Sequence, residues 1–349
     1  LRISASTYRM TIEPTASFWD CGEFIASSYK LEVGHPPGNP VFQLFARFFT
    51  LFGDAQNAAM LVNAMSALCS AFTIFFLYLT IVHFARRIFE IKGSEGVAIK
   101  LSTAIAIYGA GVVGSLAYCW SDTFWFSAVE GEVYAMSSLF TAIVFWAMLE
   151  WEEEAHQPYA NRWIVLIAFL MGLSIGVHLL NLLTIPAMVF LYYFKMYEVT
   201  AKRTWKVLFI AVAILAFILF GMIPYIPKFS AYADLLFVNL LGLPVNSGAT
   251  CFMLMLIGLG VWGFYYTYKR AKVLLNTIIL CFTMIVIGYS TFAVVVIRSS
   301  ANTPTNEYMP DNPFTLVRYL GREQYGSAPL LYGETFAAPM VSLKTPTYY

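Results

Sequence analysis

The chain alternates between long apolar runs and short polar segments. An α-helix needs about 20 apolar residues to cross a bilayer. Runs near that length lie at roughly 57–84, 101–119, 129–149, 207–224, 250–268 and 273–297. A further stretch, 163–194, is longer than one span and shorter than two, and His178, Asn181 and Pro186 interrupt it. It predicts two short helices that meet near 179–184, an arrangement that brings polar groups to membrane depth under protein cover.

Composition supports an all-α polytopic membrane protein. Of the 349 residues, 59% are hydrophobic and only 12% are charged, whereas soluble domains carry about 25% charged residues. The net charge of +1 argues against a nucleic-acid partner, because that function needs a basic face. The five cysteines are scattered and no two have metal-ligand spacing, so we expect no structural metal site.

Lysine and arginine predict the orientation of the spans, because they favour the cytoplasmic side. They concentrate in 85–100, 195–206 and 269–272, and they are sparse in 14–56, 120–128 and 225–249. This alternation is consistent only if 163–194 crosses twice. The segment 298–349 then lies on the extracytoplasmic side.

We divide the chain into a multi-pass transmembrane domain, residues 1–297, and an extracytoplasmic region, residues 298–349. Residues 1–10 are too short and too polar for a span, and 338–349 end without a closing element. We therefore expect a fragment of a longer protein, with an incomplete first span and a truncated C-terminal region.

Polar side chains collect at the extracytoplasmic ends of the spans, where their cost makes them functional candidates. Asp20 and Glu23 are three residues apart, and on a helix from Thr15 or Ser17 to about Lys30 they would share one face. Paired carboxylates in apolar surroundings repel each other, which raises one pKa and suits base chemistry. A solvated loop whose carboxylates stabilise a helix start is the alternative.

The other candidates also have structural alternatives. His35 lies in a rigid, proline-rich turn before a short amphipathic helix at 41–52, and it either acts in the site or only shapes the turn. The rest are carboxylates at a helix start, polar residues at a hairpin tip and cations near the outer surface: Glu130 and Glu132, His178 and Asn181, and Lys30, Arg47 and Arg298. Dipole stabilisation, mutual hydrogen bonding and snorkelling would explain these three groups without a ligand.

The block Glu-Pro-Thr-Ala-Ser-Phe-Trp-Asp-Cys-Gly-Glu-Phe at 13–24, followed by Gly-His-Pro-Pro-Gly at 34–38, resembles a family of large bacterial multi-pass proteins. That family is a domain of unknown function related to the protein O-mannosyltransferases, within the GT-C glycosyltransferases. The outer segment 310–326 is similar to it as well. The resemblance implies a GT-C-like helical bundle with interfacial helices in the first outer loop. It also implies that Asp20 matches the catalytic acid, with Glu23 as the neighbouring carboxylate. Which of the two is the base stays open.

The resemblance further implies a membrane glycosyltransferase in a bacterial inner membrane, with its active site facing the periplasm. It would move a mannose-like hexose from a polyprenyl-phosphate donor to a hydroxyl on a secreted or periplasmic protein. We expect one inverting attack, no metal and no other cofactor. The sequence contains no recognisable nucleotide-binding loop, and that fits a lipid-linked donor.

We predict Asp20 as the base of this reaction, and we expect cations near the leaving phosphate, with Arg298 the strongest candidate. The residues assigned to substrate or lipid-phosphate binding are His35, Arg298, Arg47, Lys30, Glu130, Glu132, His178 and Asn181. Two other classes of function stay open. One is a transporter or lipid flippase, and the other is a non-catalytic membrane assembly subunit.

Overall fold

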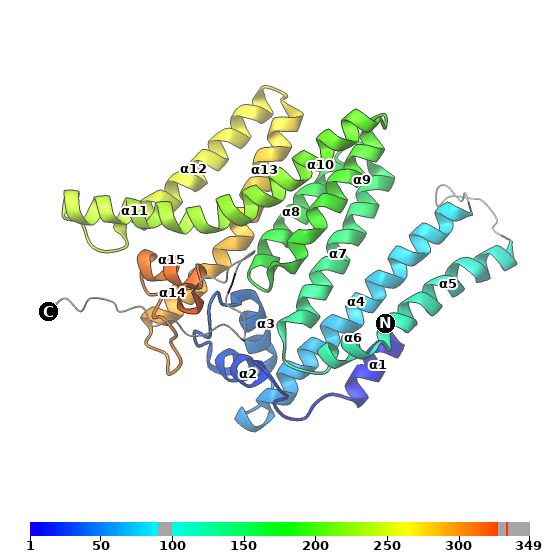
Figure 1. Ribbon diagram of the computed structural model, residues 1–349, viewed down its shortest axis with the longest axis horizontal. Helices are drawn as coiled ribbons and strands as arrows, with labels where there is room; N and C mark the ends of the chain where they lie inside the picture. Colours follow the sequence, from blue (N-terminus) through cyan, green and yellow to red (C-terminus); the bar gives the residue numbers. More distant parts are fainter. Residues whose placement is uncertain (90–99, 327–332, 334–349) are drawn as a thin grey trace.

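The computed structural model describes residues 1–89, 100–326 and 333, and the chain is built from helices (Figure 1). Within these residues, 7 helical segments are long and apolar enough to cross a membrane. They are α4 (Ala58–Ile88) with the preceding turn η1 (Ala55–Asn57), α5 (Leu101–Cys119), α7 (Val133–Glu154), η2 with α9 (Leu179–Thr184, Ile185–Met196), α10 to α11 (Ala201–Ala216, Ile223–Leu241), α12 (Ser247–Lys269), and α13 to α14 (Val273–Tyr289, Ala293–Ser300). The chain is an all-α polytopic membrane protein, as predicted.

Shorter helices gather at one end of this bundle (Figure 1). They are α1 (Arg2–Met10), α2 (Cys21–Lys30), α3 (Pro40–Thr50), α6 (Asp122–Ala128) and α15 (Pro313–Leu320). We call this the outer end. The turns from α7 to α8, α9 to α10 and α12 to α13 lie at the opposite end, which we call the basic end because Lys and Arg concentrate in and beside two of these turns, at 195–206 and 269–272. The two helices predicted inside the first outer loop are α2 and α3.

The interrupted stretch 163–194 does form two short helices, α8 (Asn161–Ile175) and α9, joined by the 3-10 turn η2. His178 and Asn181 stabilise this junction separately rather than through each other. The His178 ring accepts the Leu180 N–H at 3.2 Å, and the buried Asn181 amide donates to the Ser174 hydroxyl at 3.0 Å.

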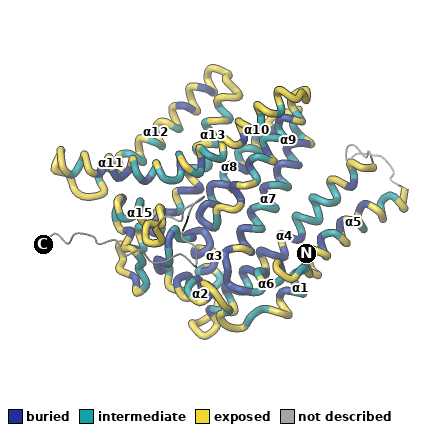
Figure 2. The backbone as a smooth tube through the Cα atoms, viewed as in Figure 1, coloured by how far each residue is buried: buried dark blue, intermediate teal, exposed yellow. Residues whose placement is uncertain are grey.

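Burial is concentrated in α2, α3, α4, α7 and α8, whereas α11 and α12 expose much of their surface (Figure 2). Close backbone packing joins α8 to α13. A Cβ atom on Gly172 would collide with the backbone of Ile285, and one on Gly288 would collide with the backbone of Gly172 and Leu173. Two glycines therefore let these helix backbones approach to a distance that no other residue permits.

One segment differs from its prediction. The stretch 225–249 was expected to be an outer loop, but α11 continues the helical path as far as Leu241. A π-helical turn at Phe217–Met222 joins it to α10, and Pro227 lies inside the helix. Proline has no N–H to donate to the carbonyl four residues earlier. The Tyr289 hydroxyl donates to that carbonyl, on Ile223, at 2.9 Å, so the helix continues without an unsatisfied acceptor.

The basic end contains an ion network that the sequence did not reveal. The buried Glu152 of α7 forms ion pairs with Arg87 of α4 and with Lys195 of α9, the latter at 3.4 Å. His83 of α4 lies 3.9 Å from the same carboxylate. A buried carboxylate that is ionised requires such partners, and this network joins three spans at one level.

Candidate active site at the outer end

The helix that carries both candidate acids starts later than predicted. Its first residue is Cys21, and Asp20 is the N-cap residue. Ser17 does not cap the helix. Its hydroxyl donates instead to Glu130 at 2.6 Å and lies 3.1 Å from the sulfur of Cys21. The preceding Trp19 has a φ of +63°, so the chain turns sharply just before Asp20.

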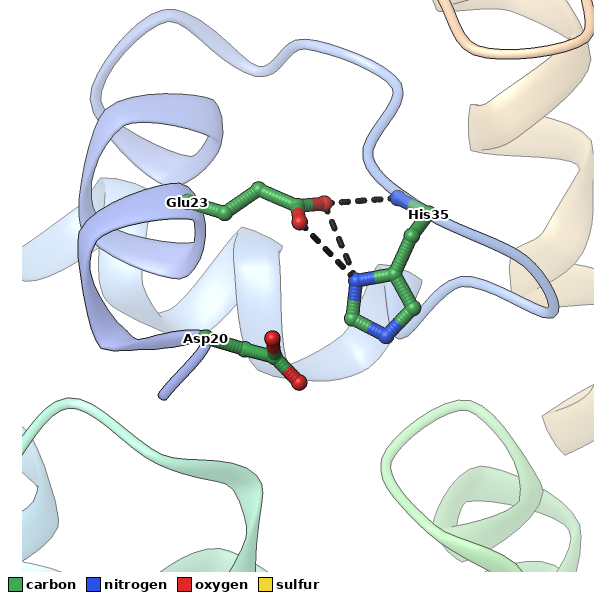
Figure 3. Close-up of side chains that lie close together, drawn as sticks. All are labelled: Asp20, Glu23 and His35. Carbon is green, nitrogen blue, oxygen red and sulfur yellow. Dashed lines mark hydrogen bonds and ion pairs between the residues drawn. The ribbon is translucent and has the colours of Figure 1, made fainter. Parts of the chain in front are cut away.

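Asp20, Glu23 and His35 form one cluster, as Figure 3 shows. The Glu23 carboxylate accepts the backbone N–H of His35 at 2.6 Å, and its two oxygens lie 3.0 and 3.1 Å from Nδ1 of the same residue. One donor atom from each of the three side chains lies within 4.8 Å of the others. Asp20 is exposed, and the other two are partly buried. The helix and the proline-rich turn thus bring together the two motifs that the sequence singled out.

This cluster contains an ion pair and a second carboxylate. Burial opposes ionisation of Glu23, but hydrogen bonds from His35 outweigh it and lower the pKa of Glu23. The hydrogen bond to Glu23 raises the pKa of His35 against the effect of burial, and the charges of Asp20 and Glu307 add to the rise. The histidine is therefore biased toward its imidazolium form.

Two glycines in the motif Gly-His-Pro-Pro-Gly make this geometry possible. A Cβ atom on Gly34 would lie 2.5 Å from the Oε1 atom of Glu23, so any side chain there would push the carboxylate away from His35. Gly38 has a φ of +76° and faces the Tyr319 hydroxyl, where a Cβ atom would lie 2.6 Å from the oxygen. The prolines between them fix the turn.

The segment after the last span holds this turn in place. Val33 donates its N–H to Thr305 at 3.0 Å, and Glu307 donates its N–H to Val33 at 3.1 Å. The fully buried Tyr319 donates its hydroxyl to the Gly34 carbonyl at 2.8 Å. Sequence reasoning did not single out Tyr319. Its only signal was its position in the outer segment 310–326.

The cations expected near the substrate phosphate lie at the other end of α2. Arg47 donates to the Tyr29 carbonyl, and Arg298 donates to the Leu31 carbonyl at 2.6 Å and to the Lys30 carbonyl at 3.2 Å. These carbonyls at the C-terminus of α2 have no partner within the helix, and cations favour that end of the helix dipole. About ten residues of helix at 1.5 Å each separate them from Asp20, which is about 15 Å.

Glu130 and Glu132 lie behind the cluster rather than on its surface. Glu130 is 4% exposed and Glu132 is 5% exposed. Glu132 accepts the Val133 N–H at 3.3 Å as the N-cap residue of α7, and its Oε1 lies 3.7 Å from the sulfur of Cys21. Burial raises the pKa of both carboxyls, that of Glu132 to about 7. These positions suit proton chemistry better than direct contact with a phosphate.

The cluster also has the donor set of a divalent-cation site, with two carboxylates and an imidazole. Both Glu23 oxygens already face the Nδ1 atom of His35. A cation bound by all three side chains would have to replace that ion pair. His178 is not among these three residues, and its ring packs 5.5 Å from that of Tyr134.

Comparisons with known proteins match this part of the chain. The family model described as Protein O-mannosyl-transferase TMEM260 N-terminal domain matches residues 20–201, just over half of the chain. A protein O-mannosyl-transferase tmem260 from Dictyostelium discoideum is 22% identical over 230 residues, which is 64% of this chain and 26% of that protein. The Mus musculus protein O-mannosyl-transferase TMEM260 is 23% identical over 171 residues, which is 49% of this chain and 22% of that protein. The chain thus spans about a quarter of the length of these relatives. No solved structure matches it.

Proposed function

The chain belongs to the TMEM260 N-terminal domain family of protein O-mannosyl-transferases, and from this premise we propose that it forms the membrane-embedded catalytic part of a GT-C-type glycosyltransferase. The donor is a mannose-like hexose on a polyprenyl phosphate. The acceptor is a Ser or Thr hydroxyl on a protein at the outer end, which faces the periplasm if the membrane is a bacterial inner membrane.

Asp20 is the base of the proposed reaction. It is the exposed carboxylate of the cluster, whereas both oxygens of Glu23 face His35. The acceptor oxygen attacks the anomeric carbon while its proton passes to Asp20. The bond from that carbon to the phosphate oxygen breaks, and polyprenyl phosphate leaves with the electron pair. A single displacement of this kind inverts the anomeric configuration.

His35 is the cation that we assign to the leaving phosphate. Its Nδ1 is held by Glu23, so its Nε2 remains to donate to a phosphate oxygen. It lies beside Asp20, whereas the guanidinium of Arg298 is bonded about 15 Å along α2. In this proposal Arg298 and Arg47 anchor the end of α2, and the reaction uses no metal ion.

The observation that carries the proposal is the convergence of Asp20 with the Glu23–His35 ion pair at the outer end. We expect Asp20→Asn in the purified intact protein to lower transfer from a polyprenyl-phosphate hexose to an acceptor peptide by at least about a hundredfold, the usual worth of a general base. The matched control is Asp54→Asn. Asp54 is an exposed carboxylate that caps the turn η1 at the same end, and we expect its variant to keep full activity.

Full transfer by Asp20→Asn would refute the assignment of the base. A separate experiment tests the metal-free mechanism. Chelation with EDTA should leave the rate of hexose transfer unchanged. A rate that EDTA abolishes and Mg²⁺ or Mn²⁺ restores would instead indicate that the three side chains hold a cation.

A further inference from the structure

Behind Asp20 lies a buried acidic pair whose surroundings contain no cation among the described residues. Neither Glu130 nor Glu132 has a Lys, Arg or His nitrogen within ion-pair distance in the described ranges, whereas Glu23 and Glu152 both do. A buried carboxylate without a cation is stabilised by binding a proton. This acidic pair is therefore suited to exchange protons rather than to hold a fixed charge.

The groups around Glu132 come from several elements. The start of α2 contributes Asp20 and Cys21, and Glu130 precedes Glu132 in the chain. The charge of Asp20 acts on Glu132, as does that of Glu130. On the α4 side, Asn63 is fully buried with its Oδ1 unpaired, and that atom would lie 3.0 Å from a Cβ atom on Gly131. All of these groups present oxygen, sulfur or negative charge.

We propose that Glu132 accepts the acceptor proton from Asp20 during each turnover and so restores the base. The inference rests on the proposed function. Asp20 is exposed in this structure, but donor and acceptor must both contact it in the reactive complex and so exclude water from it. The carboxylate behind it is then the place to which its proton can move.

The transfer is balanced in atoms and charge. The acceptor O–H proton first binds the Asp20 carboxylate as the glycosidic bond forms and the phosphate leaves. That proton then moves to the Glu132 carboxylate, which leaves Asp20 ionised for the next acceptor. Product release readmits water, and Glu132 returns its proton to solvent through Asp20.

Glu132 is better placed for this role than Glu130. The Glu130 carboxylate accepts a 2.6 Å hydrogen bond from Ser17, which precedes Asp20 by three residues. Glu132 contacts Cys21, the residue that follows Asp20. Burial raises the pKa of Glu132 to about 7, and Asp20 contributes to that rise. A carboxyl with that pKa both accepts and releases a proton near neutral pH.

The test compares Glu132→Gln with the matched variant Glu130→Gln, measuring kcat against pH from 5.5 to 8.5 in the full protein. Glutamine still accepts the Val133 N–H but cannot take up a proton. In the unsubstituted protein kcat should rise with pH around 7, because Glu132 accepts a proton only when ionised, and it should fall again at higher pH as His35 loses the proton on Nε2. Glu132→Gln should lose this rise, and its kcat should fall about tenfold at pH 8. Glu130→Gln should keep the rise with its midpoint at a lower pH, because the charge of Glu130 raises the pKa of Glu132.

We call the proposed proton transfer from Asp20 to Glu132 the relay. An unchanged pH profile in Glu132→Gln would overturn it, and so would loss of the rise in kcat in Glu130→Gln. If Asp20→Asn is inactive while Glu132→Gln behaves like the unsubstituted protein, only the relay fails and the proposed function stands. If Glu132→Gln does not fold, Glu132→Asp retains a titratable carboxyl at a changed distance. The relay then requires the midpoint of the kcat rise to shift, and an unmoved midpoint would refute it.

Discussion

Glu23 and Glu132 are the same residue type near the same Asp20, yet their surroundings favour opposite protonation states. Hydrogen bonds from His35 keep Glu23 ionised, and burial without a cation favours the protonated form of Glu132. Sites that separate acid and base roles often do so by such differences in environment. The sequence predicted Asp20 as the base and left Glu23 open as the alternative. The contacts of Glu23 with His35 now favour Asp20.

The ion pair between Glu23 and His35 should make stability depend on pH. The pKa of His35 is raised above its ordinary 6.5, so its contribution is complete below that pH and is lost as pH rises through the raised value. The pKa of Glu23 is lowered from 4.5, so its contribution is present above 4.5 and is lost as pH falls through the lowered value. The pair should therefore stabilise the fold most between about 4.5 and 6.5.

Glu23→Gln should remove this dependence. We expect it to lower the stability at pH 6 by about 1 kcal/mol, because a hydrogen bond to a charged group is stronger than one to a neutral group by about that amount. The measurement is the thermal unfolding midpoint from pH 5 to 9. The control, Asp54→Asn, should retain the fall in the unfolding midpoint above pH 6.5. An equal fall in Glu23→Gln would show that the Glu23–His35 ion pair does not cause it.

At the scale of elements, hydropathy predicted the spans because bilayer thickness fixes their length. It even predicted the break near 179–184, where His178 and Asn181 interrupt an apolar run. It missed the helical part of 225–249, because Pro227 argues against a helix unless another group bonds the freed carbonyl. That group is the Tyr289 hydroxyl, 66 residues away along the chain. No local pattern indicates such a contact.

The α8–α13 contact predicts the effect of a substitution. Gly288→Val should destabilise the protein by about 3 kcal/mol, because the added atoms meet backbone that cannot move aside. The control is Gly258→Val in α12, where a Cβ atom would meet nothing within 4 Å. We expect its effect to be below about 1 kcal/mol. Thermal midpoints of the two variants in one detergent would compare them, and equal midpoints would exclude this account of the packing.

At the scale of the whole molecule, the two ends of the chain build one site. Val33 pairs with the segment at Asn306, Arg298 bonds the end of α2, and Tyr319 bonds Gly34. Sequence analysis placed Arg298 at the same end of the spans as the first outer loop, and the structure puts it there, but the sequence could not indicate that its partners would be backbone carbonyls. The residue type predicts the charge of a side chain, whereas the partner of that charge depends on the tertiary fold.

Tyr319→Phe tests this junction. Loss of the hydroxyl leaves the Gly34 carbonyl without that donor, at a cost of about 1 to 3 kcal/mol for a buried group. The loosened turn should expose the peptide bond after Lys30, so limited trypsin digestion should cut there faster. The control is Tyr325→Phe. Tyr325 is exposed, and its ring lies under the guanidinium of Arg322, so loss of its hydroxyl should not change the rate of cutting. Equal cutting of both variants would show that the Tyr319 hydroxyl does not hold the turn.

These long-range bonds also set an order for biosynthesis. Gly34 and Tyr319 are 285 positions apart, and Arg298 and Leu31 are 267 apart. While the ribosome is still adding the later spans, Arg298 and Tyr319 have not yet been made, so the Leu31 and Gly34 carbonyls lack these donors. The loop with Asp20 and His35 therefore takes its final shape only after the last span has been made. A nascent chain therefore cannot hold the loop in its finished shape before nearly all of this membrane domain has been made.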